Sequence, residues 1–308
     1  MSTTTVIAPR GLIRSRAGAQ RRKFVNRFML SLTVAFTILA IIPLVWVVGY
    51  TIVQGIQYLN LDLLTKLPLG LGKVGGGVSN ALQGTIVITL LASLFSIPIA
   101  LLAGVYAANH PNTKLGIGVR FSTDVLAGVP SIIVGLFGYA AIVVPMGTYS
   151  AFAAAIAVAI IMIPSITRTT EEMLKLVPNA LREGSLALGS PEWKTTVRVL
   201  LPAALAGVVT GFILAIARGV GETAPLLFTA LGNDRYDIGS IVKSGQYQRM
   251  IMQPTDALTL TMYKYSQSPF PERQQQAWAV ALLLMIFVLG VNILTRWLVL
   301  RNTAKHQR

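Results

Sequence analysis

The chain has 308 residues, of which 54% are hydrophobic and 12% are charged, and its mean hydropathy is +0.65. A soluble domain carries about 25% charged residues, so this composition predicts an integral membrane protein. The absence of cysteine excludes disulfides, thiolate metal sites and cysteine nucleophiles, and the two histidines, His110 and His306, argue against a histidine metal site.

The net charge of +15 could serve nucleic-acid binding or could set the orientation of the chain in a membrane. The distribution of the basic residues favours a role in orientation. The basic residues lie mainly at the ends of apolar runs, which is typical of the positive-inside pattern. The N-terminal tail, residues 109–121, residues 167–198 and the C-terminal tail hold more of them than residues 54–81 and 224–273 do. We therefore expect both termini in the cytoplasm, the lipid bilayer as the surroundings and no nucleic-acid partner.

Residues 1–27 carry seven Lys/Arg and no acid, and an apolar run of about 26 residues follows at 28–53. That run is long enough to span a bilayer and lacks a small-residue cleavage site, so we interpret residues 1–27 as a basic cytoplasmic tail. Five more apolar runs predict spans at residues 82–107, 122–144, 149–166, 199–221 and 276–300. The predicted fold class is an all-α integral membrane protein with six transmembrane helices over residues 28–300 and a cytoplasmic tail at residues 301–308.

Four features between and within these spans are informative. Residues 54–76 form a loop before a glycine run, and residues 224–273 form a long polar loop with four prolines. Asp124, near the start of the third span, is either a rare intramembrane acid or an acid at the cytoplasmic edge, and the edge is favoured. Small residues and Pro130 in the third span predict a helix that packs tightly or bends.

Residues 183–202 form the one sizeable amphipathic stretch of the chain. Pro178 can open a short helix at its first position, and Gly189 can close it. Ser190 is expected to cap a second helix that has Pro191 and Glu192 in its first turn. A first helix of about eleven residues is only about 16 Å long, which is too short to cross a bilayer. We expect two cytoplasmic helices joined by a sharp corner. The alternative is an ordinary cytoplasmic loop helix between two membrane spans.

Small residues recur every four positions along the fifth span, at Ala203, Gly207, Gly211, Ala215 and Gly219. In lipid this spacing lets helices pack backbone to backbone. The pattern predicts packing within the chain, which is favoured, or packing against a second membrane subunit.

Two Arg–Glu pairs are the candidate functional charges. Arg218 and Glu222 are four residues apart at the end of the fifth span, and Arg168 and Glu171 are three apart at the cytoplasmic end of the fourth. Charged residues in a membrane normally face a cavity and pair. Because a guanidinium binds an oxyanion bidentately and a nearby carboxylate keeps that binding weak, these residues suit an anion path. The alternatives are a static ion pair near the interface and ordinary boundary charges.

The amphipathic stretch resembles the EAA loop of ABC-importer permeases, whose pattern is E-A-A-x-x-x-G, nine residues, then I-x-L-P. The matching positions are Glu183, Gly189, Leu201 and Pro202, with Gly184 and Ser185 in place of the two alanines. The resemblance implies a MetI-like permease fold with its ABC transmembrane type-1 core at about residues 80–300. It also implies that these six residues belong to a coupling helix that docks on an ATP-hydrolysing subunit.

Three further segments resemble the phosphate-permease branch of that family: N-A-L-Q-G-T-I at residues 80–86, A-G-V-P-S-I-I-V-G-L-F-G at 127–138 and R-G-V-G-E-T-A-P at 218–225. The chain is similar to PstA-type permeases, which implies ATP-driven phosphate import across the bacterial cytoplasmic (inner) membrane. The implied partners are a PstC-type second permease, a PstB-type ATPase dimer and an extracytoplasmic phosphate-binding protein. The resemblance further implies that Arg168, Glu171 and Arg218 act in transport, and Glu222 joins them by its spacing and its motif.

The chain lacks a G-x-x-x-x-G-K-[ST] motif, so we expect a non-catalytic subunit without a cofactor, with ATP and Mg²⁺ on the partner ATPase. No catalytic and no metal-binding residue is predicted. One alternative is an importer of another oxyanion such as sulfate or molybdate, which the EAA loop does not distinguish. A second is an ion-coupled secondary transporter, which often shows internal repeats; none is evident here. A membrane-embedded enzyme is disfavoured because no nucleophile–base arrangement is present.

Overall fold

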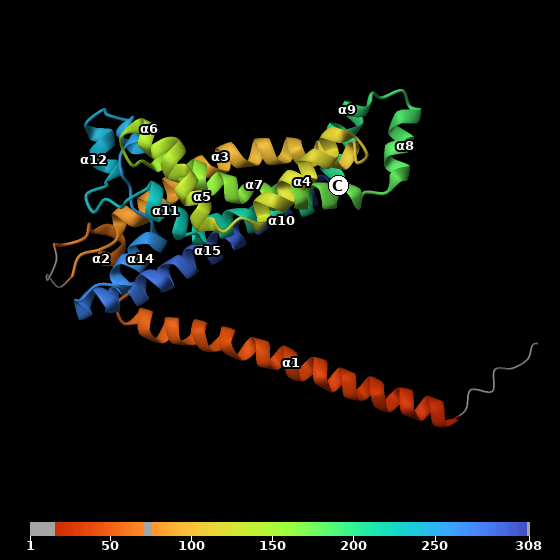
Figure 1. The fold of residues 1–308 in the computed structure, drawn as a ribbon, viewed down its shortest axis with the longest axis horizontal. Coiled ribbons are helices and arrows are strands. Elements are labelled where there is room, and N and C mark those ends of the chain that lie inside the picture. The colour runs from red at the N-terminus through yellow and green to blue at the C-terminus, as the bar shows by residue number, and fades with distance from the viewer. Residues whose placement is uncertain (1–15, 71–74, 307–308) are drawn as a thin grey trace, which may run out of the picture. The chain divides into compact units, whose positions relative to one another are not determined.

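The structure is a computed structural model that describes residues 16–70 and 75–306, and this part of the chain contains helices but no β-strand (Figure 1). The chain divides into two compact units, Met1–Ile52 and Val53–Arg308. The first contains most of α1 (Arg16–Ile56), and the second contains the other helices. Residues 1–15 and 307–308 of the predicted tails lie outside the described residues, whereas residues 16–27 and 301–306 are helical.

Within the described residues, five helices are long and apolar enough to cross a membrane, and they coincide with five of the six predicted spans. They are α1, α3 (Ser79–Asn109), α7 (Ala151–Lys175), the continuous helix that ends in α10 (Leu201–Gly221), and α15 (Pro271–His306). The helix before α10 consists of α9 (Glu192–Thr195) and a π-helical turn (Thr196–Leu200). Each helix extends beyond its predicted span, because an apolar run marks only the part that fits the hydrocarbon core.

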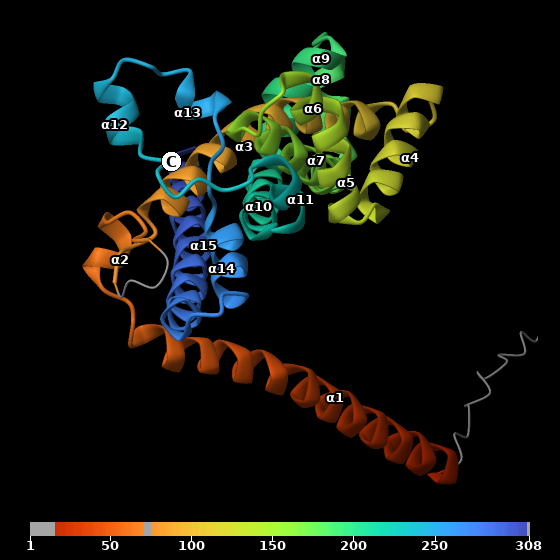
Figure 2. The same cartoon turned by 60° about the vertical axis from the view of Figure 1, so that its left-hand side comes forward.

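The predicted span at residues 122–144 is not one straight helix. This segment consists of α4 (Lys114–Gly128), α5 (Ser131–Gly138), a π-helical turn (Tyr139–Val143) and α6 (Val144–Met146), and its two halves meet at a bend of 101° (Figure 2). Pro130 causes the break, because it has no N–H for the helix and forces Val129 into an extended conformation. The expected tendency to bend is therefore confirmed, and the bent pair would make a sixth span.

Helix α7 is the centre of the second unit and packs against α3, α4, α5 and α10. Small residues allow this close packing. A Cβ on Gly104 of α3 would lie 2.6 Å from the carbonyl oxygen of Thr167, and one on Gly211 of α10 would lie 2.5 Å from Thr169. Gly207 and Gly219 contact α7 in the same way. These glycines of the fifth span therefore pack within the chain, which was the favoured of the two predictions.

Residues 224–270, here called the distal segment, lie at the end of the bundle opposite α8 and α9 (Figure 1). They form a folded unit rather than the predicted polar loop, with helices α11 (Ala224–Thr229), α12 (Ile238–Lys243), α13 (Arg249–Met252) and α14 (Leu258–Ser266). Tyr236 and Leu258 are completely buried in it. Burial raises the pKa of Tyr236 to about 12. Such buried residues contribute to the folding of the segment. The shorter loop before α3 likewise contains a helix, α2 (Leu61–Thr65).

The first turns of α3 bind the backbone of the distal segment through three side chains. These hydrogen bonds join Asn80 to the Asn233 carbonyl (3.0 Å), Gln83 to the Ile238 amide (2.6 Å) and Thr85 to the Leu258 amide (2.9 Å). Gly84 makes the approach feasible, because a Cβ there would lie 2.0 Å from the carbonyl oxygen of Asp256. The N-A-L-Q-G-T motif therefore holds the distal segment on α3.

Candidate functional site

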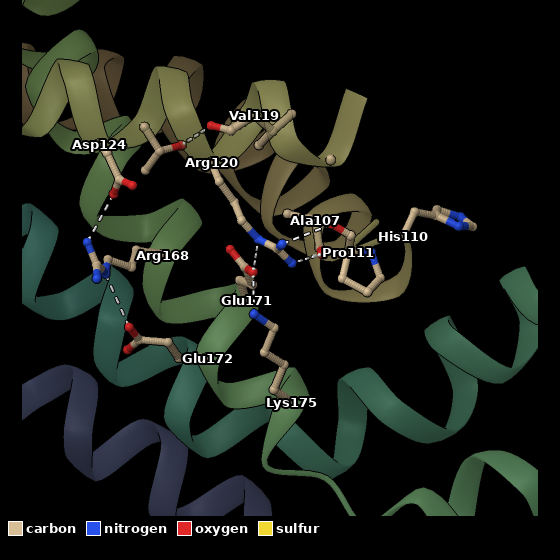
Figure 3. Close-up of polar contacts among 12 residues, drawn as sticks. Ala107, His110, Pro111, Val119, Arg120, Asp124, Arg168, Glu171, Glu172 and Lys175 are labelled. Atoms are coloured by element: carbon tan, nitrogen blue, oxygen red, sulfur yellow. Dashed lines mark hydrogen bonds and ion pairs between the residues drawn. The ribbon is translucent and has the colours of Figure 1, made fainter. Parts of the chain in front are cut away.

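Six charged residues form a cluster where α4 lies against the half of α7 nearer to α8 (Figure 3). They are Arg120 and Asp124 on α4, and Arg168, Glu171, Glu172 and Lys175 on α7. Residues three and four apart on a helix are neighbours on its surface, so α7 brings its four charges to adjoining faces. The contacts divide the cluster into an exposed set and a buried set.

The exposed set is centred on Arg168. Its Nη1 lies 3.1 Å from Asp124 Oδ1, and its Nε lies 3.2 Å from Glu172 Oε1. The three side chains are 64%, 64% and 57% exposed in the isolated chain, so Asp124 lies on the surface rather than in the helix core. An open guanidinium held by two carboxylates can exchange one of them for another oxyanion.

The buried set is centred on Glu171, which is not the partner of Arg168 as predicted. Glu171 Oε1 lies 2.5 Å from Arg120 Nε and 2.5 Å from Lys175 Nζ, and its side chain is only 10% exposed. The reason is helical geometry: Glu171 is turned inward between α4 and α7, whereas Glu172, four residues after Arg168, shares the exposed face of the arginine.

Arg120 was missed as a site residue because its place in a short connection indicated only membrane topology. Its guanidinium also donates to the carbonyls of Ala107 (2.8 Å) and Pro111 (3.0 Å). Ala107 lies in the last turn of α3, where carbonyls lack helical partners. Arg120 therefore joins the end of α3, the connection to α4, and α7. The available signal was the spacing of Arg120 and Asp124, which are four residues apart on one helix.

Arg218 and Glu222 form the second predicted pair, and the structure confirms that they face each other. Arg218 Nε lies 3.6 Å from Glu222 Oε1, and the side chains are 50% and 15% exposed. Glu222 ends α10, and its carbonyl accepts a hydrogen bond from Thr259 Oγ1 of α14 at 2.9 Å. The backbone of Glu222 is thus held between α10 and the distal segment, and its carboxylate, the more buried of the pair, faces Arg218.

Arg168 and Arg218 lie at different depths of the bundle. Gly211 of α10 packs against Thr169, so this level of α10 corresponds to Arg168. Arg218 is seven residues farther along α10, a rise of about 10 Å. The predicted path residues therefore do not form one site. Arg168 and Arg218 occupy two positions, each with its own carboxylates, and Glu171 lies in the buried set beside the first.

The predicted coupling stretch begins with a helical hairpin made of α8 (Asn179–Ala187) and α9. Gly189 closes α8 as predicted, with φ of +77°. Its N–H binds the Leu186 carbonyl at 2.9 Å, and the Ser190 N–H binds the Ser185 carbonyl at 3.3 Å, which is a Schellman motif. The predicted helix starts are one residue early, because the prolines stay extended and take the N-cap positions: Pro178 precedes α8, and Pro191, not Ser190, precedes α9.

The tip of the α8–α9 hairpin is exposed and partly apolar. Glu183, Gly184 and Gly189 are exposed, and no atom lies within 4 Å of a Cβ built on either glycine. Leu188 and Trp193 are 88% and 67% exposed. Ser185 Oγ lies 2.9 Å from Thr195 Oγ1 and links the two helices. Leu201, which is half-buried, and Pro202, which is exposed, lie apart from this tip in the first turn of α10.

Among residues 16–70 and 75–306, no group of three or more His, Cys, Asp or Glu residues could hold a metal ion. Arg168 and Arg218 could bind an anion, and the exposed tip of the α8–α9 hairpin could bind another protein. Residues 100–303 match the family described as binding-protein-dependent transport system inner membrane component. The chain belongs to this family.

Curated relatives of this transport component cover most of its length. The phosphate transport system permease protein PstA of Xylella fastidiosa (strain 9a5c) is 40% identical over 286 residues, which are 92% of this chain and 95% of the relative. The phosphate transport system permease protein PstA of Yersinia pestis is 41% identical over 224 residues, 72% of this chain and 76% of the relative.

Solved structures support the fold of this transport component. A chain of the bacterial alginate ABC transporter, solved with an alginate pentasaccharide-bound periplasmic protein, matches with a TM-score of 0.53 at 14% identity and covers 92% of this chain and 96% of that one. A chain of the MetNI methionine ABC transporter matches with a TM-score of 0.52 at 22% identity, covering 72% and 93%. The chain therefore has the all-helical fold of ABC-importer membrane subunits.

Proposed function

We propose that the chain is a permease subunit of an ATP-driven phosphate importer of the inner membrane. The observation that carries this proposal is the placement of Arg168 and Arg218, two exposed arginines at depths about 10 Å apart. A charged side chain in a membrane protein normally faces water or another protein group. The relatives named phosphate transport system permease protein support phosphate as the anion.

Phosphate transfer between the two arginines rests on ligand exchange. A guanidinium binds two phosphate oxygens at once and stays charged. At Arg168 the incoming phosphate displaces Asp124 or Glu172, and at Arg218 it displaces Glu222. Return of the carboxylate then releases the phosphate, so neither site holds it too tightly for conduction. Glu171 contributes differently: it holds α4 on α7 and so fixes the surface that carries Arg168 and Asp124.

The energy comes from ATP hydrolysis on a partner. The α8–α9 hairpin docks on a PstB-type ATPase dimer through Glu183, Gly184, Ser185 and Gly189, while Leu201 and Pro202 connect it to α10. The distal segment faces an extracytoplasmic phosphate-binding protein, and a PstC-type permease completes the path. Both termini are then cytoplasmic. ATP and the binding protein supply the differential affinity that a conformational change requires, each at its own end of the bundle.

The test is uptake of radiolabelled phosphate by cells that lack their own phosphate permease and carry this chain with its partner subunits. Excess arsenate should block uptake, whereas excess sulfate should not. The Arg218→Gln variant should abolish uptake and still co-purify with the ATPase, because Arg218 lies away from the hairpin. An assembled, ATP-hydrolysing complex without phosphate uptake would contradict the phosphate assignment. Normal uptake by Arg218→Gln would remove this arginine from the path.

A further inference from the structure

Asn109 is the last residue of α3, and its side chain contacts both arms of the α8–α9 hairpin. Its Nδ2 donates to Thr196 Oγ1 at 3.0 Å, in the π-helical turn that continues α9. Its Oδ1 accepts a hydrogen bond from Nη2 of Arg182 on α8. One amide therefore joins a membrane helix to two segments that lie 73 and 87 residues away in the sequence.

The amide group suits this position because it provides a donor and an acceptor on one short stem. Thr196 uses its own hydroxyl proton on the Glu192 carbonyl at 3.0 Å, so its oxygen is left to accept from Asn109. Arg182 can only donate. An aspartate would lose the donor to Thr196, and a leucine would lose both bonds.

The surroundings of Asn109 are mostly polar. A cavity of about 90 Å³ is lined by Asn109, His110, Arg182, Leu186, Glu192 and Thr195 together with Thr196. The hairpin itself is braced by the hydroxyl pair of Ser185 and Thr195 at 2.9 Å. The two arms of the hairpin are thus linked to each other, and Asn109 connects them to α3 through polar contacts.

The other end of α3 is fixed as well. Asn80, Gln83 and Thr85 bind the distal segment there. Helix α3 has 31 residues and is therefore about 46 Å long. It is one continuous helix, with Pro98 inside it, and its polar side chains bind the hairpin at one end and the distal segment at the other.

We propose that Asn109 is a positioning residue that couples the α8–α9 hairpin to α3, so that a displacement of the hairpin by the ATPase is passed along α3 to the distal segment. This inference rests on the proposed function, because it takes the hairpin as the ATPase contact. It assigns to Asn109, Arg182 and Thr196 a role in linking hydrolysis to transport rather than in binding phosphate.

The test compares variants of the full transporter, reconstituted with its ATPase, second permease and phosphate-loaded binding protein. Asn109→Ala should keep the ATPase bound and the basal hydrolysis rate, and should lower the phosphate transported per ATP by about tenfold, the scale of one hydrogen bond to a charged group. The KM for phosphate should not change. Asn109→Gln should recover part of the coupling. Asn112→Ala changes an exposed asparagine three residues farther on and is the matched control.

Thr196→Val gives a second, independent arm in case Asn109→Ala does not assemble. At nearly constant volume it removes the acceptor for Asn109 together with the hydroxyl donor to the Glu192 carbonyl, and it should also lower coupling. In the double variant the loss should not exceed that of Asn109→Ala, since interacting residues are not additive. Wild-type coupling in either single variant, or additive losses in the double, would overturn the proposal. If the wild-type complex does not bind the ATPase or import phosphate, the proposed function fails instead.

Discussion

Arg120 on α4 and Glu171 on α7 form an ion pair with 2.5 Å between Nε and Oε1. A second ion pair beside it, between Arg168 and Asp124, joins the same two helices with the charges exchanged. In the first pair the arginine belongs to α4, and in the second it belongs to α7. The first is mostly buried and the second is open (Figure 3). The two pairs should therefore respond differently to substitution.

Arg120→Gln should destabilise the chain. It leaves the Glu171 carboxylate with one cation and removes two hydrogen bonds to the end of α3. Removing one partner of a buried pair costs about 3–5 kcal/mol, and we expect about 2–3 kcal/mol here because Arg120 is 30% exposed. Thermal unfolding of the purified complex measures this. The double variant Arg120→Gln/Glu171→Gln should be more stable than Arg120→Gln alone. Equal melting of Arg120→Gln and wild type would show that the pair does not hold α4.

Arg168→Gln should have the opposite profile, with stability nearly unchanged and uptake lost. Exposed ion pairs contribute about 0–1 kcal/mol, and Arg168 is 64% exposed. Phosphate uptake and thermal unfolding of the same preparation separate the two effects. Lys114→Gln, an exposed cation at the start of α4, is the control and should change neither. Wild-type uptake by Arg168→Gln would leave Arg218 without the second site that the path requires.

Gly189→Val should weaken binding of the ATPase. The position has open space for a side chain within this chain, but its φ of +77° disfavours any residue with a Cβ, most of all a β-branched one. We expect a distorted corner and reduced co-purification of the ATPase. Gly184→Ala is the informative comparison: Gly184 is helical with open surroundings, so alanine stabilises α8 by up to about 1 kcal/mol. Full co-purification of Gly189→Val would argue against docking at this corner.

Asp237 should make the distal segment sensitive to acid. Burial raises the pKa of Asp237, but hydrogen bonds from Ser240, Gly239 and Gln83 outweigh this and hold the pKa below its ordinary value of 3.8. Because the folded-state pKa is depressed, the carboxylate stabilises the segment above the unfolded pKa, and this contribution is lost as the pH falls through the folded pKa.

Hydrogen exchange over residues 237–243 measures this effect. Asp237→Ala removes the N-cap of α12 and should lower protection by about 1 kcal/mol at neutral pH. The difference from wild type should shrink below pH 3.8 as Asp237 is protonated. Asp237→Asn, which keeps an acceptor, should stay protected at both pH values. Equal protection of Asp237→Ala and wild type at pH 7 would show that the cap does not order α12.

Sequence patterns predicted those parts of the fold that depend on local physics. Apolar run length located five spans, and the glycine at 189 located the corner of the hairpin, because each signal is carried by the segment itself. The stripe of small residues in the fifth span also gave the correct packing for Gly207, Gly211 and Gly219, which contact α7.

Partners across helices could not be predicted in this way. The spacing of Arg168 and Glu171 suggested a pair, but Arg120 and Asp124 approach from α4 and divide the charges differently. Arg218 and Glu222 were paired correctly because they are only four residues apart, with Arg218 in the last turn of α10 and Glu222 at its C-cap. The distal segment was missed because part of its order comes from contacts with Asn80, Gln83 and Thr85 on α3, which lie far away in the sequence.

The elbow at Pro130 limits where lipid can touch this protein. Helix α4 has 15 residues and so spans about 22 Å, less than the roughly 30 Å of a bilayer's hydrocarbon core. Because the two halves meet at 101°, they cannot both run along the membrane normal. Acyl chains provide no partner for the backbone groups that such a break leaves open, so irregular backbone at membrane depth borders protein or water. At membrane depth, the elbow would therefore border protein or water rather than lipid.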